Sequence, residues 1–169
     1  MKKTNQLHLA LSPYLQQHAS NPVSWQFWNN ENLEHAKKQN KLLIISIGYA
    51  ACHWCHVMEK ECFEDEEVAT VMNDFFFSFK IDREEMPAVD AFYMQALQLM
   101  TKQGGWPLNI VALPNGLPVW GATYVPKEQW IDVLHQLNDL FIEDPEKMFD
   151  YAEKLQNGMA LANDMLQIY

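Results

Sequence analysis

The sequence predicts an α/β domain in which a central mixed β-sheet is flanked by helices. Short, strongly apolar segments alternate with amphipathic ones along much of the chain, which is typical of a sheet covered by helices. Asn115-Gly116 marks a tight turn between two further apolar segments, so we expect an antiparallel hairpin as well. With 169 residues, 49% of them hydrophobic, the chain is long enough for one well-buried domain.

Apolar runs and capping signals locate the individual elements. We expect strands at residues 42–47, 75–81, 108–113 and 119–124. We expect helices at residues 29–40, from residue 52, from the acidic run 64–67, at 86–100, at 127–141 and from residue 144. The order of these elements gives alternating strands and helices first, then a hairpin and closing helices.

The chain divides into three parts by composition. Residues 1–28 are rich in large apolar side chains and contain Pro13 and Pro22, so we expect an irregular N-terminal arm packed on the domain. His8 and His18 in this arm are expected at the surface. Residues 29–142 are expected to form the main domain, and residues 143–169 an additional C-terminal helix.

The C-terminal helix carries an apolar stripe that must be covered. Its members are Phe149, Ala152, Leu155, Met159, Ala162 and Leu166. The cover is this domain, a second copy of the chain, or a partner such as a missing C-terminal domain, docked through the helix at residues 145–166.

Cys52 and Cys55 carry the clearest chemical signal. They stand at the start of a helix that follows an apolar strand, on one helical face, where they can form and release a disulfide. Unpaired N–H groups and the positive end of the helix dipole favour a thiolate at Cys52. We therefore expect Cys52 to attack a substrate disulfide and Cys55 to resolve the mixed disulfide that results. Protonated His53 or His56 is expected to stabilise the thiolate further.

Cys62 is the third cysteine and follows Cys55 by seven residues. On a continuous helix the two are separated by about 10 Å, which is too far for a disulfide. We expect a structural, partly buried thiol at Cys62 in preference to a regulatory one.

Charge and composition exclude several partners. The formal net charge of −10 and the pI near 4.9 argue against nucleic acid and against an anionic membrane surface. Residues 1–15 have no continuous apolar segment and no small-residue cleavage site, and no later apolar run is long enough to span a bilayer. We therefore expect a soluble cytoplasmic protein, in which the close cysteine pair is catalytic or metal-binding.

Motifs spread over residues 10–126 resemble the thioredoxin-like family that contains the spermatogenesis-associated thioredoxin-like proteins and their bacterial relatives. This family has long been labelled a domain of unknown function. The motifs are Ser12-Pro13-Tyr14-Leu15, Asn21-Pro22-Val23, Ser46-Ile47-Gly48-Tyr49, Cys52-His53-Trp54-Cys55-His56, Phe63-Glu64-Asp65-Glu66-Glu67, Asp82-Arg83-Glu84-Glu85 and Gly104-Gly105-Trp106-Pro107-Leu108.

The resemblance implies a thioredoxin-like fold with a thiol-disulfide site at Cys52 and Cys55. It also implies a cis bond before Pro107 that faces the disulfide, where the main chain of Trp106 pairs with a bound peptide. The rings of Trp54 and Trp106 are then expected to form an aromatic rim.

Three departures limit what the resemblance implies. Ser46 stands where thioredoxins place a buried Asp, so proton transfer is expected to fall to His53, His56 or water. Ala51 replaces the Trp that commonly precedes the first cysteine in thioredoxins. Full-length members of the family usually continue into a large α/α toroid, which these 169 residues do not include, so we expect either a short member or an excised domain.

The leading functional prediction is a thiol-disulfide oxidoreductase that uses no cofactor and acts on protein or small-molecule disulfides and dithiols. One alternative is a non-enzymatic interaction module. Another is a transient metal site made by two thiolates and two imidazoles. The Cys-x-x-Cys-His pattern at residues 52–56 also matches haem attachment, which the missing export signal and the strand–helix context disfavour.

Overall fold

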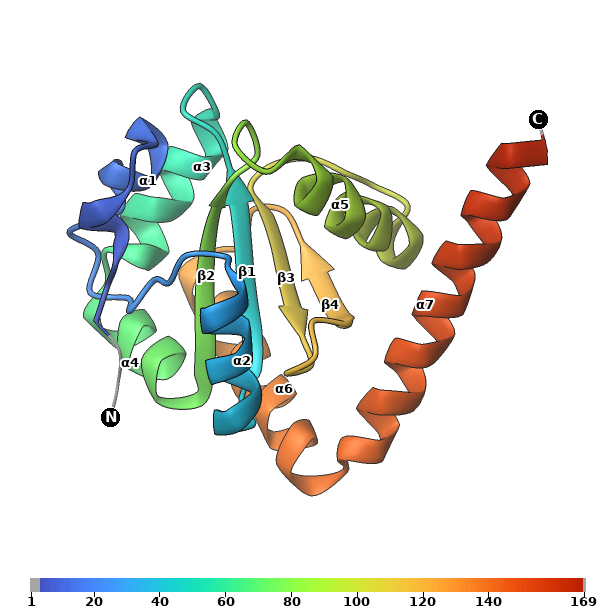
Figure 1. The fold of residues 1–169 in the computed structure, drawn as a ribbon. Helices are drawn as coiled ribbons and strands as arrows, with labels where there is room; N and C mark the ends of the chain where they lie inside the picture. Colours follow the sequence, from blue (N-terminus) through green and yellow to red (C-terminus); the bar gives the residue numbers. More distant parts are fainter. Residues whose placement is uncertain (1–3, 169) are drawn as a thin grey trace.

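A four-stranded sheet with the strand order β2-β1-β3-β4 forms the centre of the molecule (Figure 1). The computed structural model describes the backbone of residues 4–168 and the side chains up to residue 161. The strands are β1 (Leu42–Gly48), β2 (Phe76–Asp82), β3 (Leu108–Ala112) and β4 (Pro118–Ala122). β1 pairs with β2 in parallel, while β3 is antiparallel to both β1 and β4. The predicted mixed sheet and its hairpin are confirmed.

Helices cover both faces of this sheet (Figure 1). They are α1 (Pro13–Gln17), α2 (Asn30–Gln39), α3 (His53–Met58), α4 (Glu66–Phe75), α5 (Pro87–Thr101), α6 (Lys127–Glu143) and α7 (Pro145–Ile168). Two short elements are also helical: η1 (Leu7–Leu9) is a 3₁₀-helix, and η2 (Glu59–Phe63) is a π-helix that continues α3. Apolar side chains of α1, α3, α4 and α6 pack on one face, and those of α2 and α5 on the other.

Capping side chains explain where the helices begin. The Asn29 side chain accepts a hydrogen bond from the Asn32 N–H at the start of α2, and Asp65 accepts one from the Val68 N–H at the start of α4. Phe75, which the sequence placed in the second strand, is instead the last residue of α4. The strand begins one residue later, where Phe76 comes into register with Leu42 of β1.

The N-terminal arm packs against the domain and contains two short helices, η1 and α1, within a path that is otherwise irregular. Ser12 caps α1 by accepting from the Leu15 N–H, and its hydroxyl donates to Asp82 at 2.7 Å. Gln26 forms a parallel bridge with Phe79 and so covers the outer edge of β2. Leu7, Tyr14, Leu15, Val23 and Trp25 are all buried in the core. The arm therefore completes the core of the domain.

His18 is completely buried, so the prediction that it lies at the surface is wrong. Its Nδ1 lies 3.1 Å from the Tyr14 carbonyl oxygen, and its Nε2 lies 3.6 Å from a carboxylate oxygen of Glu59. The cause is α1, of which His18 is the C-cap and which turns the imidazole inward against η2. Burial lowers the pKa of His18 far below its ordinary value. His8, in contrast, is exposed as predicted.

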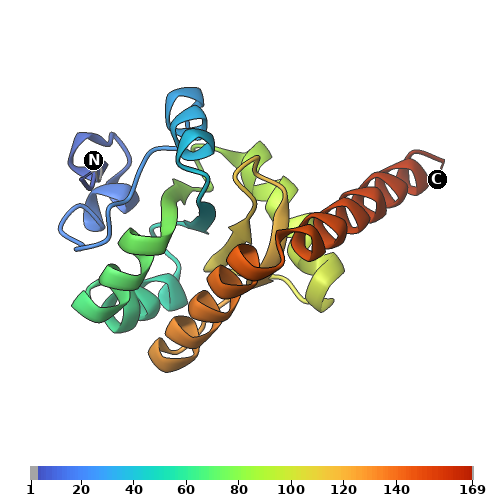
Figure 2. The same cartoon turned by 90° about the horizontal axis from the view of Figure 1, so that it is seen from below.

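α7 packs on this domain, beside α5 and β4 (Figures 1 and 2). Met148, Ala152 and Met159 are buried, at the spacing of one helical face. Phe149 is 47% exposed, so its assignment to the covered stripe is wrong. The side chains of Ala162 and Leu166, also assigned to the stripe, lie outside the described residues.

The buried position of Trp25 yields a prediction about stability. Its ring packs edge-to-face on Phe63 at 5.0 Å between centroids, and its Nε1–H donates to Asn21. We expect Trp25→Ala to lower the free energy of unfolding by about 3–5 kcal/mol in urea titrations followed by circular dichroism. Trp54→Ala is the matched control, because that side chain is 51% exposed. Equal losses in the two variants would contradict an arm that belongs to the core.

Candidate functional site

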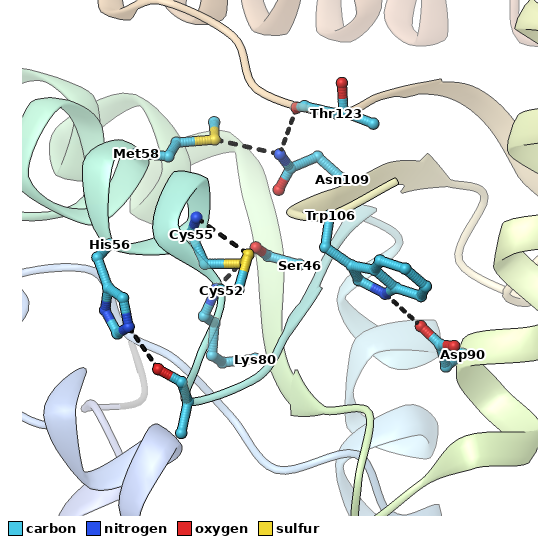
Figure 3. The surroundings of a disulfide bond; sticks show 11 residues. Ser46, Cys52, Cys55, His56, Met58, Lys80, Asp90, Trp106, Asn109 and Thr123 are labelled. Carbon is cyan, nitrogen blue, oxygen red and sulfur yellow. Dashed lines mark hydrogen bonds between the residues drawn. A yellow bond between two sulfur atoms is a disulfide. The ribbon is translucent and has the colours of Figure 1, made fainter. Parts of the chain in front are cut away.

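A disulfide joins Cys52 and Cys55 at the point where β1 passes into α3. The two Cα atoms are 5.3 Å apart. Cys52 is the N-cap of α3, and its sulfur accepts a hydrogen bond from the Cys55 N–H at 3.2 Å (Figure 3). The unpaired amides and the positive end of the helix therefore point at the Cys52 sulfur. Cys52 retains 4% of its surface and Cys55 only 1%, so Cys52 is the nearer of the two to solvent.

The two histidines of the motif make their contacts away from this sulfur. His56 Nε2 lies 2.6 Å from the Ala50 carbonyl oxygen, so this nitrogen carries a proton and donates it to the turn before Cys52. His53 is exposed, and its ring lies 5.4 Å from the Trp54 ring. The hydrogen bond that Cys52 accepts comes from the main chain instead. Stabilisation of the thiolate by either imidazole stays a prediction.

The Trp106–Pro107 bond is cis, as the resemblance implied. The Trp106 ring is held by two charged neighbours: its Nε1–H donates to Asp90 at 2.8 Å, and the Arg83 guanidinium lies 4.2 Å from its centroid. A salt bridge at 3.5 Å links Arg83 and Asp90 to each other. Nothing in the sequence connects Arg83 and Asp90 with Trp106, because the three residues come from different parts of the chain.

Trp54 forms the other aromatic side of the site. Its ring packs against Tyr124 at 5.1 Å between centroids. The Tyr124 hydroxyl donates to the Glu61 carboxylate, which fixes this second ring. Trp54 and Trp106 thus pack on separate neighbours, and the aromatic rim expected of them stays a prediction.

Polar side chains cross the sheet beneath α3 at one register level (Figure 3). Lys80 of β2 pairs with Ser46 of β1, which pairs with Asn109 of β3. All three are buried. Lys80 Nζ donates to the Ser46 hydroxyl at 2.9 Å, while Asn109 donates to the Thr123 carbonyl oxygen. We call Lys80, Ser46 and Asn109 the polar row.

Lys80 is enclosed by aromatic rings. Its ammonium nitrogen lies 5.0 Å from the ring centroid of Phe63, 5.3 Å from that of Tyr14 and 5.4 Å from that of Trp25. Burial lowers the pKa of Lys80 to about 7, and the charge of Glu59 opposes this effect. Residues 75–81 were predicted to form a strand, and so apolar a run should have marked the lysine within it as buried.

Gly48 brings Tyr14 and Cys55 together. A Cβ at Gly48 would stand 2.6 Å from Cys55 Sγ and closer still to the Tyr14 hydroxyl oxygen. Both atoms therefore occupy the space that a side chain would fill, and any larger residue at position 48 would displace them. Burial raises the pKa of Tyr14 well above its ordinary value, so its hydroxyl stays protonated.

Glu59 completes the buried cluster at the start of the π-helix η2. Its carboxylate accepts a hydrogen bond from the Asn21 side chain at 3.1 Å. Burial raises the pKa of Glu59, and the Asn21 hydrogen bond and the charge of Lys80 oppose the increase. The extra residue of a π-turn was not visible in the sequence, where residues 52–61 read as one regular helix.

Cys62 lies on η2, away from the disulfide. It is completely buried, and its thiol donates to the Val125 carbonyl oxygen at 3.5 Å. Burial raises the pKa of Cys62 to about 12, so the thiol is protonated near neutral pH. This environment supports the structural interpretation of Cys62.

The described part of the chain has neither a cluster of metal ligands nor a membrane-spanning helix. Among these residues, no group of three or more His, Cys, Asp or Glu side chains is arranged to hold a metal ion. Within the same residues, no helix combines the length and the apolar character needed to cross a membrane.

The environment of Lys80 predicts a pH dependence of stability. Because the pKa of Lys80 is lowered on folding, the unfolded chain binds this proton first as the pH falls from about 10.5 to about 7. The folded protein therefore loses stability as the pH falls through that interval, and the size of this loss stays constant at lower pH. We expect the free energy of unfolding of Lys80→Met, relative to the unaltered protein, to rise by roughly 1 kcal/mol per pH unit from pH 10 down to pH 7. A difference that is constant with pH would contradict the lowered pKa.

Comparisons with known proteins agree with this geometry. The family model described as "Protein of unknown function, DUF255" matches residues 4–160. Human spermatogenesis-associated protein 20 is 48% identical over 167 residues, covering 95% of this chain and 21% of that protein. The rat protein of the same name is 37% identical over 170 residues, covering 97% and 22%. The chain thus spans about a fifth of the length of these relatives.

Solved structures share the fold at low sequence identity. A structure titled "DsbH Oxidoreductase" superposes with a TM-score of 0.54 at 17% identity, covering 70% of this chain and 85% of that one. A thioredoxin from Thermus thermophilus gives a TM-score of 0.52 at 15% identity, covering 68% and 88%. The predicted thioredoxin-like fold is confirmed, and the chain belongs to the DUF255 family.

Proposed function

We propose that this chain is a thiol-disulfide oxidoreductase domain that acts on disulfides or dithiols of proteins or small molecules. The observation that carries the proposal is the Cys52–Cys55 disulfide at the N-cap of α3, with the Cys55 N–H directed at the Cys52 sulfur. The fold shared with thioredoxins supports it. The cytoplasm is the proposed compartment, where close cysteine pairs are commonly catalytic.

The reaction proceeds through a mixed disulfide. In the reducing direction, the Cys52 thiolate attacks a substrate disulfide, forms a bond to one substrate sulfur and releases the other as a thiol. Cys55 then attacks the Cys52 sulfur, which closes the Cys52–Cys55 disulfide and releases the second substrate thiol. Two electrons pass from the protein to the substrate, and the reverse sequence oxidises a dithiol.

The surroundings fit these roles. The helix N-terminus and the Cys55 amide stabilise negative charge on Cys52, which favours its thiolate in the reduced state. Cys55 is more deeply buried, so a substrate disulfide reaches Cys52 first, and Cys55 is left to react with the Cys52 sulfur. We propose that the Trp106 main chain, next to cis Pro107, pairs with an extended substrate, and that the exposed Trp54 ring contacts its side chains.

Substitution of the resolving cysteine tests the assignment. We expect Cys55→Ser, reduced and then mixed with oxidised glutathione, to accumulate a glutathione adduct on Cys52, because the second step is blocked. Peptide mass spectrometry after alkylation locates the adduct.

The matched control is Cys62→Ser, which removes a cysteine outside the pair. This variant should close the Cys52–Cys55 disulfide without accumulating an adduct. Detection of the adduct on Cys62 in Cys55→Ser, or no adduct at all, would refute the proposed function.

A further inference from the structure

Attack by Cys55 requires a proton acceptor inside the protein. A thiol is a weak nucleophile until it is deprotonated, and Cys55 keeps only 1% of its surface exposed. The histidines of the motif are directed elsewhere, since His56 donates to the Ala50 carbonyl and His53 lies exposed beside Trp54. The sheet beneath α3 is therefore the part of the protein that can supply the proton acceptor.

β1 connects the polar row to the position of Cys55. The Cys55 sulfur stands over Gly48, in the space of its missing side chain. Ser46 precedes Gly48 by two residues on the same face of the strand, about 7 Å along it. Lys80 Nζ is bonded to the Ser46 hydroxyl at 2.9 Å (Figure 3). Ser46 thus lies between Lys80 and the position of Cys55, and all three side chains are buried.

Tyr14 lies close to both Cys55 and Lys80. Its buried hydroxyl has no hydrogen-bond partner among the described residues and stands next to the Cys55 sulfur over Gly48. Its ring lies 5.3 Å from Lys80 Nζ. An unpartnered buried hydroxyl is costly, and in the reduced protein it is placed to donate to a Cys55 thiolate.

We propose that the amine of Lys80 accepts the proton of Cys55 by way of the Ser46 hydroxyl when Cys55 resolves the mixed disulfide. The Cys55 S–H bond breaks, Lys80 gains the proton, and the Cys55–Cys52 bond forms as the Cys52–substrate bond breaks. The substrate sulfur leaves with the electron pair of that bond and takes a proton from solvent. In the reverse direction, Lys80 returns its proton to Cys55.

The other ionisable groups facing Lys80 are committed to other partners. His18 contacts the Tyr14 carbonyl from the end of α1, and Glu59 on η2 is bonded to Asn21. Asp82, on β2 itself, accepts from the Ser12 hydroxyl. Lys80 has Ser46 as its hydrogen-bond partner among the described residues. Its pKa near 7 means that both the accepting and the donating forms are populated near neutral pH.

This inference rests on the proposed function, and one experiment separates the two. The reduced protein is mixed with oxidised glutathione, quenched with acid at intervals and analysed by mass spectrometry. Formation of the Cys52–glutathione adduct reports the attack by Cys52. Conversion of this adduct into the Cys52–Cys55 disulfide reports the attack by Cys55. The measurement is repeated between pH 6 and pH 9.

We expect Lys80→Met to slow the second step about tenfold or more near pH 7, since a general base contributes at least that factor, while the first step changes little. The deficit should shrink toward pH 9, where hydroxide removes the proton from Cys55. Lys80→Arg should show the same deficit, because an arginine keeps the positive charge and the donor to Ser46 but does not deprotonate. Lys38→Met, on the exposed face of α2, is the control and should behave like the unaltered protein.

Three results would overturn the inference. They are normal resolution in Lys80→Met, full rescue by Lys80→Arg, and a deficit of equal size at every pH, which indicates a purely structural role. If Lys80→Met does not fold, Lys80→Arg alone decides, through the same pH profile. Failure of the unaltered protein to form any adduct or disulfide would overturn the proposed function together with the inference.

Discussion

The enclosure of Lys80 is the constraint on which the rest of this structure depends. A buried ammonium group loses its hydration, and the loss is offset only if other groups surround it closely. Tyr14 and Trp25 from the arm and Phe63 from η2 provide aromatic faces, and Ser46 provides the hydrogen bond. Segments far apart in the sequence must therefore close over β2 together.

The same constraint ties the fold to the chemistry. Replacing a buried charge by an apolar side chain is commonly neutral or stabilising, so stability alone does not account for Lys80. Its partner Ser46 lies on the face of β1 over which Cys55 packs, two residues from Gly48. Under the proposed function the polar row has a role in proton transfer. It places a lysine of lowered pKa near a cysteine that must exchange a proton. The arm then affects the site indirectly, because its Tyr14 and Trp25 rings help to exclude water from Lys80.

The sequence predicted the parts of the fold that depend on local pattern. The strand at residues 42–47, the helix that follows Cys52 and the Asn115-Gly116 hairpin all rest on periodicity, capping and turn residues, which are visible in short stretches. The features that it missed depend on contacts between distant segments. His18 is buried only because α1 turns it against η2, and nothing near it in the chain indicates this. The π-turn of η2 is likewise not indicated by any local sequence preference.

Lys80 lies between these two cases. The run at residues 75–81 was predicted to be a strand, and its strongly apolar composition places the lysine within it in the core. What the sequence could not provide was its neighbour, since the pairing of β1 with β2 in register sets Lys80 beside Ser46. The substitution of Ser46 for the carboxylate of thioredoxins was visible, but its partner was not.

The reduction potential of the Cys52–Cys55 pair tests the central claim most directly. The purified protein is equilibrated with glutathione redox buffers, and free thiols are alkylated and counted on each peptide by mass spectrometry. The account predicts a reversible two-electron couple at Cys52 and Cys55, with a potential between about −270 and −180 mV, the interval between thioredoxin and protein disulfide isomerase. Cys62 should not take part. A pair that stays reduced across this range, or that closes irreversibly, would contradict the account.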